Sequence, residues 1–124
     1  MQYIILDMEW NQPWPGSYSA KKALPSPLRG EIVQIGAVRM TQEQQVADEF
    51  QILIRPKYFK KMNRKVASLT GIRDSVLREH GIPATRYHAG LSEEERRQNQ
   101  EDFQFERCPV MVATNAFGMG IDKS

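Results

Sequence analysis

Hydrophobic and polar positions along the chain predict three strands in its first half. Residues 3–10 (YIILDMEW) form an apolar run interrupted only by Asp7 and Glu9. Two further segments, EIVQIGAVRM and DEFQILIRP, are rich in aliphatic and β-branched residues and flank the polar turn TQEQQVA. We expect an antiparallel meander whose first strand is buried, with Leu6 and Met8 against a core.

From residue 60 onward the pattern changes to helices and short strands. MNRKVASL predicts a helix capped by Asn63, with Val66 and Leu69 facing inward. RDSVLREHG predicts a second helix that ends at Gly81 as its C′ residue. PATRYHAG and CPVMVATN predict strands, the latter buried. Between them, SEEERRQNQEDFQFER predicts a helix that begins with the capping box of Ser92 and Glu95, with a thin apolar stripe of Phe103 and Phe105.

The predicted fold class is therefore α/β in the order βββαβαβ. A three-stranded antiparallel meander is extended by a parallel βαβ unit, which we expect to be right-handed. This is the order of the ribonuclease-H-like fold. With 124 residues the chain has the length of a single domain, 1–124.

Composition narrows the class of protein only slightly. An apolar content of 40% and a charged content of 26% are typical of soluble globular proteins, and a net charge of +2 does not by itself indicate a nucleic-acid partner. The basic residues gather in RPKYFKKMNRK, which is either a solvated surface or a stripe that follows a phosphate backbone.

The single cysteine, Cys108, excludes an internal disulfide and favours a buried, inert thiol in a reducing compartment. Without a recognisable signal peptide or membrane span, we expect a cytoplasmic protein with no membrane partner.

The carboxylates in the first strand carry the clearest chemical signal. Side chains on a strand alternate between its faces, so Asp7 and Glu9 leave the sheet on the same side. Two neighbouring carboxylates are half of a site for Mg²⁺ or Mn²⁺, and two protein ligands alone would bind such an ion weakly. His80 and His88 are the candidate bases, and helix-end and hydrogen-bonding roles are the alternatives for them.

The first half resembles the DEDD-type (DnaQ-like) 3′–5′ exonucleases. Three motifs carry the resemblance over residues 1 to about 75: Asp7-x-Glu9, EIVQIGAV, and LTGI after a basic segment. The resemblance implies a metal-dependent exonuclease in which Asp7 and Glu9 are ligands. It also implies two more acidic ligands and a base, whose motifs this chain lacks.

The second half, from about residue 78 to residue 124, resembles the second RecA-like domain of RecQ-family DNA helicases. YHAGL and VATNAFGMGIDK carry this resemblance. It implies positions near bound DNA or near the coupling of DNA to ATP hydrolysis: Gly90, Thr114, Asn115, Gly118, Gly120 and Asp122. The chain has no G-x-x-x-x-G-K-[ST] loop, so we expect no ATP site and no ATP-driven unwinding.

Two incomplete halves joined within one domain indicate an artificial or recombined chimera of segments 1–76 and 77–124. We expect such a chain to have no complete catalytic site and, if it is artificial, to be produced recombinantly. It could retain weak binding of divalent metal or nucleic acid. The alternatives are a metal-dependent 3′–5′ exonuclease acting on DNA or RNA ends, with Asp122 recruited beside Asp7 and Glu9, and a non-catalytic nucleic-acid-binding module.

The expected partner is single-stranded nucleic acid. Its candidate contacts are Trp10 and Trp14, through stacking on bases, and Thr114, Asn115 and Gly118, through the helicase resemblance. Partial burial against the core is the alternative for the tryptophans. Sheets cut from larger ones leave exposed strand edges, so a homodimer through such an edge is also expected.

Overall fold

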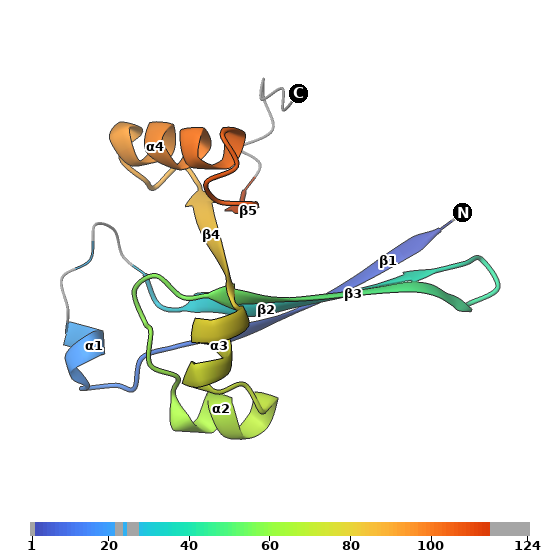
Figure 1. The fold of residues 1–124 in the computed structure, drawn as a ribbon, viewed down its shortest axis with the longest axis horizontal. Helices are drawn as coiled ribbons and strands as arrows, with labels where there is room; N and C mark the ends of the chain where they lie inside the picture. Colours follow the sequence, from blue (N-terminus) through green and yellow to red (C-terminus); the bar gives the residue numbers. More distant parts are fainter. Residues whose placement is uncertain (1, 22–23, 25–27, 115–124) are drawn as a thin grey trace. The chain divides into compact units, whose positions relative to one another are not determined.

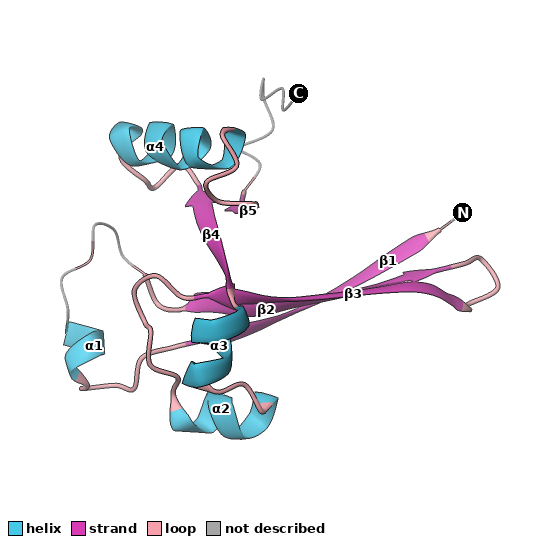
Figure 2. Cartoon of the chain, in the orientation of Figure 1, coloured by secondary structure: helices cyan, strands magenta, loops and turns pink. Residues whose placement is uncertain are grey.

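The computed structural model describes residues 2–21, 24 and 28–114 (Figure 1). The chain forms two compact units, residues 1–81 and 82–124. Figure 2 distinguishes its helices from its strands. In chain order, the elements are β1 (Tyr3–Asn11), α1 (Tyr18–Lys21), β2 (Glu31–Met40), β3 (Val46–Arg55), α2 (Arg64–Thr70), α3 (Asp74–His80), β4 (Ile82–Tyr87), α4 (Glu93–Gln104) and β5 (Val110–Ala113).

The first unit is built on the predicted antiparallel meander. β2 pairs with β1 on one side and with β3 on the other, both antiparallel. The β1–β2 register is regular from Tyr3 opposite Met40 to Glu9 opposite Gln34. It then shifts, so that Trp10 lies opposite Ile32 and one extra residue, Val33, is accommodated in a bulge on β2.

The hydrophobic core of this unit lies at the end of the sheet where β1 ends and β2 begins. Helices α2 and α3 pack there, α2 against β1 and α3 against β3. The cluster consists of Val33, Met62, Ile72 and Leu77, with Leu53, Val66 and Ala67 packed against it. Val33 is fully buried, so the bulge residue sits at the centre of the core.

The far end of the sheet is open, which contradicts the prediction of a buried first strand. Leu6 is 56% exposed and Met8 is 39% exposed. On β3, burial increases along the strand from exposed Phe50 to buried Ile54. The reason is length: the two short helices cover only the end of strands that extend well beyond them.

Of the two helix ends predicted in the first unit, the Asn63 cap is confirmed, whereas Gly81 does not adopt the left-handed conformation of a C′ glycine. Asn63 caps α2, its side chain accepting a hydrogen bond from the Lys65 backbone N–H at 3.0 Å. Gly71 ends α2 in the left-handed conformation, with φ of 74°. Gly81 ends α3 with φ of −69°, in extended backbone. A Cβ at Gly81 would lie 3.0 Å from the backbone nitrogen of Arg55, so close packing, and not a left-handed turn, favours glycine there.

Two inward-facing apolar predictions for helices were wrong. Leu69 on α2 is 87% exposed, because Val66 and Ala67 form the face of that helix that packs on the core. Phe105 lies beyond the end of α4 and is 64% exposed, so it does not extend an apolar stripe from Phe103.

The second unit contains the predicted strand–helix–strand unit. β4 and β5 are parallel, with Ala84 opposite Val110 and Tyr87 opposite Ala113, and α4 packs against β4. Asn99 on α4 donates a 2.8 Å hydrogen bond to the backbone carbonyl of Arg86 on β4. The α/β class and the parallel βαβ unit are thus confirmed, although β5 is only partly buried.

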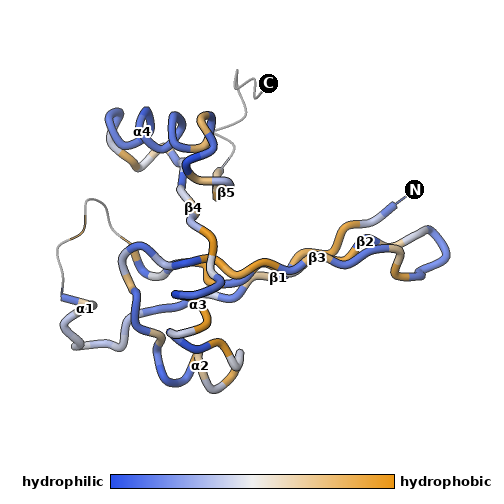
Figure 3. The backbone as a smooth tube through the Cα atoms, in the orientation of Figure 1, coloured by the Kyte–Doolittle hydropathy of each residue, from blue (hydrophilic) through white to orange (hydrophobic). Residues whose placement is uncertain are grey.

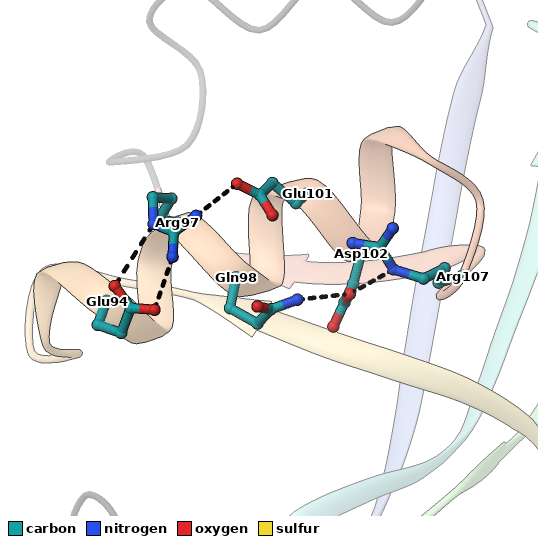
Figure 4. Close-up of polar contacts among 6 residues, drawn as sticks. All are labelled: Glu94, Arg97, Gln98, Glu101, Asp102 and Arg107. Atoms are coloured by element: carbon teal, nitrogen blue, oxygen red, sulfur yellow. Dashed lines mark hydrogen bonds and ion pairs between the residues drawn. The ribbon is translucent and has the colours of Figure 1, made fainter.

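Helix α4 is held mainly by polar contacts along its own surface. It is hydrophilic over most of its length (Figure 3) and has no fully buried residue. Figure 4 shows Arg97 between Glu94 and Glu101, with nitrogen–oxygen distances of 2.7 and 2.8 Å. The hydrogen bond to Glu94 raises the pKa of the Arg97 guanidinium. Beyond the helix end, Arg107 reaches back to Asp102 at 2.8 Å.

Candidate functional site

The two carboxylates of β1 occupy an open part of the sheet. Asp7 lies opposite Gly36 of β2 and Glu9 lies opposite Gln34, in the regular part of the ladder. Both side chains therefore leave the sheet on the same face. Asp7 is exposed and Glu9 is half-buried, next to the point where the bulge begins. Among the residues that the structure describes, no heavy atom lies within 4 Å of the position a Cβ at Gly36 would take, so these residues leave the surface beside Asp7 open.

Carboxylate oxygens are suitable ligands for a hard divalent ion, so Asp7 and Glu9 fit Mg²⁺ or Mn²⁺ by donor type. Within the part of the chain that the structure describes, no group of three or more His, Cys, Asp or Glu side chains is placed to hold a metal ion. An ion held by these two residues would keep most of its water ligands. Asp122, the third candidate ligand, lies outside the described residues.

Just beyond the carboxylates, β1 ends in a buried polar residue that organises the neighbouring loop. Asn11 is fully buried. Its side-chain nitrogen donates to the carbonyl oxygens of Phe59 at 2.9 Å and of Lys61 at 3.0 Å. Its side-chain oxygen accepts a 2.9 Å hydrogen bond from the Asn63 backbone N–H. One side chain thus ties residues 59–63 to the end of the strand.

Glu31, at the start of β2, binds the preceding part of the same loop. Its carboxylate accepts hydrogen bonds from the backbone N–H groups of Lys57 at 2.8 Å, Tyr58 at 2.9 Å and Phe59 at 2.6 Å. At the other end of the loop, Asp74 accepts from the Met62 backbone N–H at 2.6 Å. The loop of residues 57–63, hereafter the clamped loop, is therefore fixed by two carboxylates and an amide.

The clamped loop and the start of α2 present the basic segment to solvent. Its exposed basic side chains are Lys57, Lys60, Lys61, Arg64 and Lys65. The ammonium of Lys65 lies 5.7 Å from the centroid of the Trp14 ring, within cation–π range. Trp14 is 54% exposed and Trp10 is 45% exposed. Neither tryptophan is a core residue, and Trp14 lies at the edge of the basic segment.

The remaining candidates lie at the end of α3, in the second unit or outside the described residues. Thr114 follows β5, and its backbone N–H donates to the carbonyl of Tyr87 at 3.1 Å. Asn115, Gly118 and Gly120 lie outside the described residues. The His88 ring nitrogen Nδ1 accepts a 3.1 Å hydrogen bond from the Gly90 backbone N–H, which is a local structural role. His80 is an exposed residue at the end of α3, 3.8 Å from Glu79.

Sequence reasoning missed the residues that fix the clamped loop, above all the two that lie on the sheet. Asn11 and Glu31 each lie at the end of a predicted strand, where polar side chains are common. The only available signal was that Asn11 directly follows the apolar run and Glu31 directly precedes the next one. Their shared loop is distant in sequence, so only the fold connects them.

The model of the helicase conserved C-terminal domain family matches residues 42–124, which is more than half of the chain. The chain therefore belongs to this family. The match begins before β3 and so includes elements of both compact units.

Curated relatives confirm the resemblance to RecQ helicases. Over 48 residues the chain is 52% identical to the ATP-dependent DNA helicase RecQ of Bacillus subtilis, which covers 39% of this chain and 8% of that protein. It is 50% identical over 48 residues to the ATP-dependent DNA helicase Q5 of Rattus norvegicus, covering 39% of this chain and 5% of the relative. The chain spans less than a tenth of the length of either relative.

Among solved structures, the chain is similar to the nuclease domain of 3′hExo, a DEDDh family member, determined bound to rAMP. The TM-score is 0.50 at 14% identity, covering 96% of this chain and 54% of that one. At this identity the similarity concerns the fold alone. It confirms the exonuclease-like, ribonuclease-H-like fold predicted from the order of elements. Among the described residues, no helix is long and apolar enough to span a membrane.

Proposed function

We propose that this chain is a recombined chimera without a complete catalytic site, which retains weak binding of single-stranded nucleic acid and of divalent metal ions. The observation that carries the binding proposal is the exposed Trp14 ring beside Lys65, at the edge of the basic segment. Stacking of a base on an aromatic ring contributes about 1–3 kcal/mol, and nearby ammonium groups neutralise the phosphates.

The clamped loop supports this proposal because it places charges at fixed positions. Its backbone is held by Glu31, Asn11 and Asp74, so the basic side chains project from a rigid segment. A rigid basic surface loses less conformational entropy on binding than a mobile one. Asp7 and Glu9 would hold a divalent ion through their carboxylate oxygens, and the ion would supply charge neutralisation at a bound phosphate.

The chimeric origin is supported by the division of the similarities. RecQ relatives share about half of their residues with this chain over 48 positions, whereas the fold as a whole is similar to an exonuclease domain. The chain also separates into two compact units. Artificial recombination explains both facts. An artificial chain would be produced recombinantly and would have no natural cellular compartment.

Binding is tested by fluorescence anisotropy of a labelled single-stranded oligonucleotide. We expect Trp14→Ala to weaken binding about fivefold or more, because one stacking contact is lost. Tyr18→Ala is the matched control, since Tyr18 is an aromatic residue of the same segment and is 86% exposed. Affinity that falls steeply with salt would support contact with phosphates. Equal affinities for Trp14→Ala and the unmodified chain would contradict the proposal.

The alternative of a metal-dependent 3′–5′ exonuclease is favoured by the accessible Asp7–Glu9 pair. It is tested with an end-labelled single-stranded oligonucleotide in Mn²⁺, comparing the chain with Asp7→Ala. We expect intact oligonucleotide in both. Shortening from the 3′ end that disappears in Asp7→Ala would instead establish a working nuclease site. Metal-independent binding without cleavage would favour the non-catalytic module.

A further inference from the structure

β1 is an outer strand of the three-stranded sheet in the first unit, and its apolar side chains are exposed on both faces. Ile4 is 74% exposed, Ile5 54% and Leu6 56%. Tyr3 and Met8 extend the exposed apolar surface in both directions. An outer strand also presents a row of unpaired backbone N–H and C=O groups, which is a template for another strand.

The segment Tyr3–Met8 lacks the features by which proteins protect such an edge. It contains no proline and no lysine, and Asp7 is its only charge. The bulge lies beyond it, after Glu9. β3, on the other side of β2, differs: it has adjacent acids at Asp48 and Glu49 and packs against α3.

We propose that a second copy of this chain pairs with β1, antiparallel, to form an isologous dimer centred on Leu6. In such a pair each contact occurs twice, so Leu6 lies opposite Leu6 of the second copy. The sheets of the two copies then join along β1 into one continuous sheet, and the unpaired backbone groups of both β1 edges are satisfied.

The geometry of β1 selects this register. The regular part of the strand runs from Tyr3 to Glu9, and its central residue is Leu6. Complete antiparallel overlap of that stretch with itself is therefore centred there. A register centred on Asp7 would place two carboxylates directly opposite each other, which is destabilising. The Leu6 register places Asp7 opposite Ile5 and Glu9 opposite Tyr3.

The available surface suits a weak dimer. Each copy offers five large apolar side chains between Tyr3 and Met8, with exposures from 39% to 74%. At about 100 Å² for each side chain, two copies offer roughly 1,000 Å², which is near the lower limit for a specific interface. Pairing covers part of this area and adds backbone hydrogen bonds, so we expect dimerisation that depends on protein concentration.

Cysteine cross-linking tests the register in a Cys108→Ser background. Leu6→Cys is expected to form a disulfide-linked dimer, because directly opposite residues have Cα atoms about 4.5–5.5 Å apart. Ile4→Cys is the matched control on the same face. Its counterpart lies four residues along the strand, about 13 Å away, beyond disulfide range. Equal cross-linking of both variants would overturn the register.

Sedimentation velocity over a range of concentrations tests the dimer itself. Leu6→Lys is expected to weaken association at least tenfold, whereas Tyr18→Lys leaves it unchanged. Far-UV circular dichroism checks that both variants fold. If Leu6→Lys does not fold, the cross-linking experiment still tests the proposed dimer. A chain that stays monomeric across the micromolar range would overturn the proposal. Amide-exchange protection of β1 in such a monomer would mean that another part of the same chain covers the edge.

Discussion

Asn11 and Glu31 lie directly opposite each other on β1 and β2, and both side chains bind the clamped loop. Asn11 binds its second half and Glu31 its first half. Because the two residues are paired in the sheet, the position of the loop is determined by the β1–β2 register. A shift in that register would separate the two anchors and release the loop that carries the basic segment.

Replacing Asn11 with alanine is expected to destabilise the first unit strongly. The substitution leaves the carbonyls of Phe59 and Lys61 and the N–H of Asn63 without their partner in a buried site. Since each unsatisfied buried group costs about 1–3 kcal/mol and relaxation recovers part of it, we expect a loss of about 2–4 kcal/mol. Urea denaturation followed by circular dichroism measures it. Gln12→Ala, at an exposed neighbour, is expected to change stability by less than about 0.5 kcal/mol.

Replacing Glu31 with glutamine tests the charge of the other anchor. The amide keeps one acceptor oxygen but presents an NH₂ group to backbone N–H donors, so the contacts with Lys57, Tyr58 and Phe59 cannot all survive. We expect a loss of about 1–3 kcal/mol in the free energy of unfolding. Hydrogen exchange of the amides of residues 57–59 is expected to accelerate. Unchanged exchange at these three amides would show that the carboxylate does not hold the loop.

The turn between β2 and β3 offers a stabilising substitution. Gln44 has φ of 61°, a left-handed conformation that is unfavourable for residues with a Cβ. Its backbone N–H donates to the Thr41 carbonyl at 3.1 Å, which closes the turn. Gln44→Gly is expected to raise the free energy of unfolding by about 0.5–1 kcal/mol, as measured by thermal or urea denaturation. Glu43→Gly, at the preceding turn position, is expected to lower the free energy of unfolding. If Glu43→Gly raised it as much as Gln44→Gly does, relief of backbone strain at Gln44 would not be the cause of the gain.

Helix α4 depends on its N-terminal cap because it has no fully buried residue. The Ser92 hydroxyl accepts a 3.2 Å hydrogen bond from the Glu95 backbone N–H. Ser92→Ala is expected to cost about 1 kcal/mol, visible as a loss of helical circular dichroism at lower temperature than in the unmodified chain. Ser92→Asp should preserve the cap. If Ser92→Ala and Ser92→Asp melt alike, the cap does not limit the stability of the helix.

Except for the short helix α1, the sequence by itself determined the kinds and order of the elements. Strand pattern, the Asn63 cap and the capping box at Ser92 are local signals, since each depends on residues within a few positions of one another. The same locality made Asp7 and Glu9 recognisable as a pair on one face of a strand. Family motifs added the helicase and exonuclease resemblances, because they too are short patterns in fixed order.

Tertiary structure alone decided what covers each element. Whether Leu6 is buried depends on how far α2 and α3 extend over the sheet, and no property of the strand itself contains that information. Asn11 and Glu31 both bind the clamped loop, which follows β3. They can do so because the β1–β2 register places them opposite each other. Burial and long-range hydrogen bonds arise between segments that are distant in sequence, and therefore a local pattern predicts the element but not its surroundings.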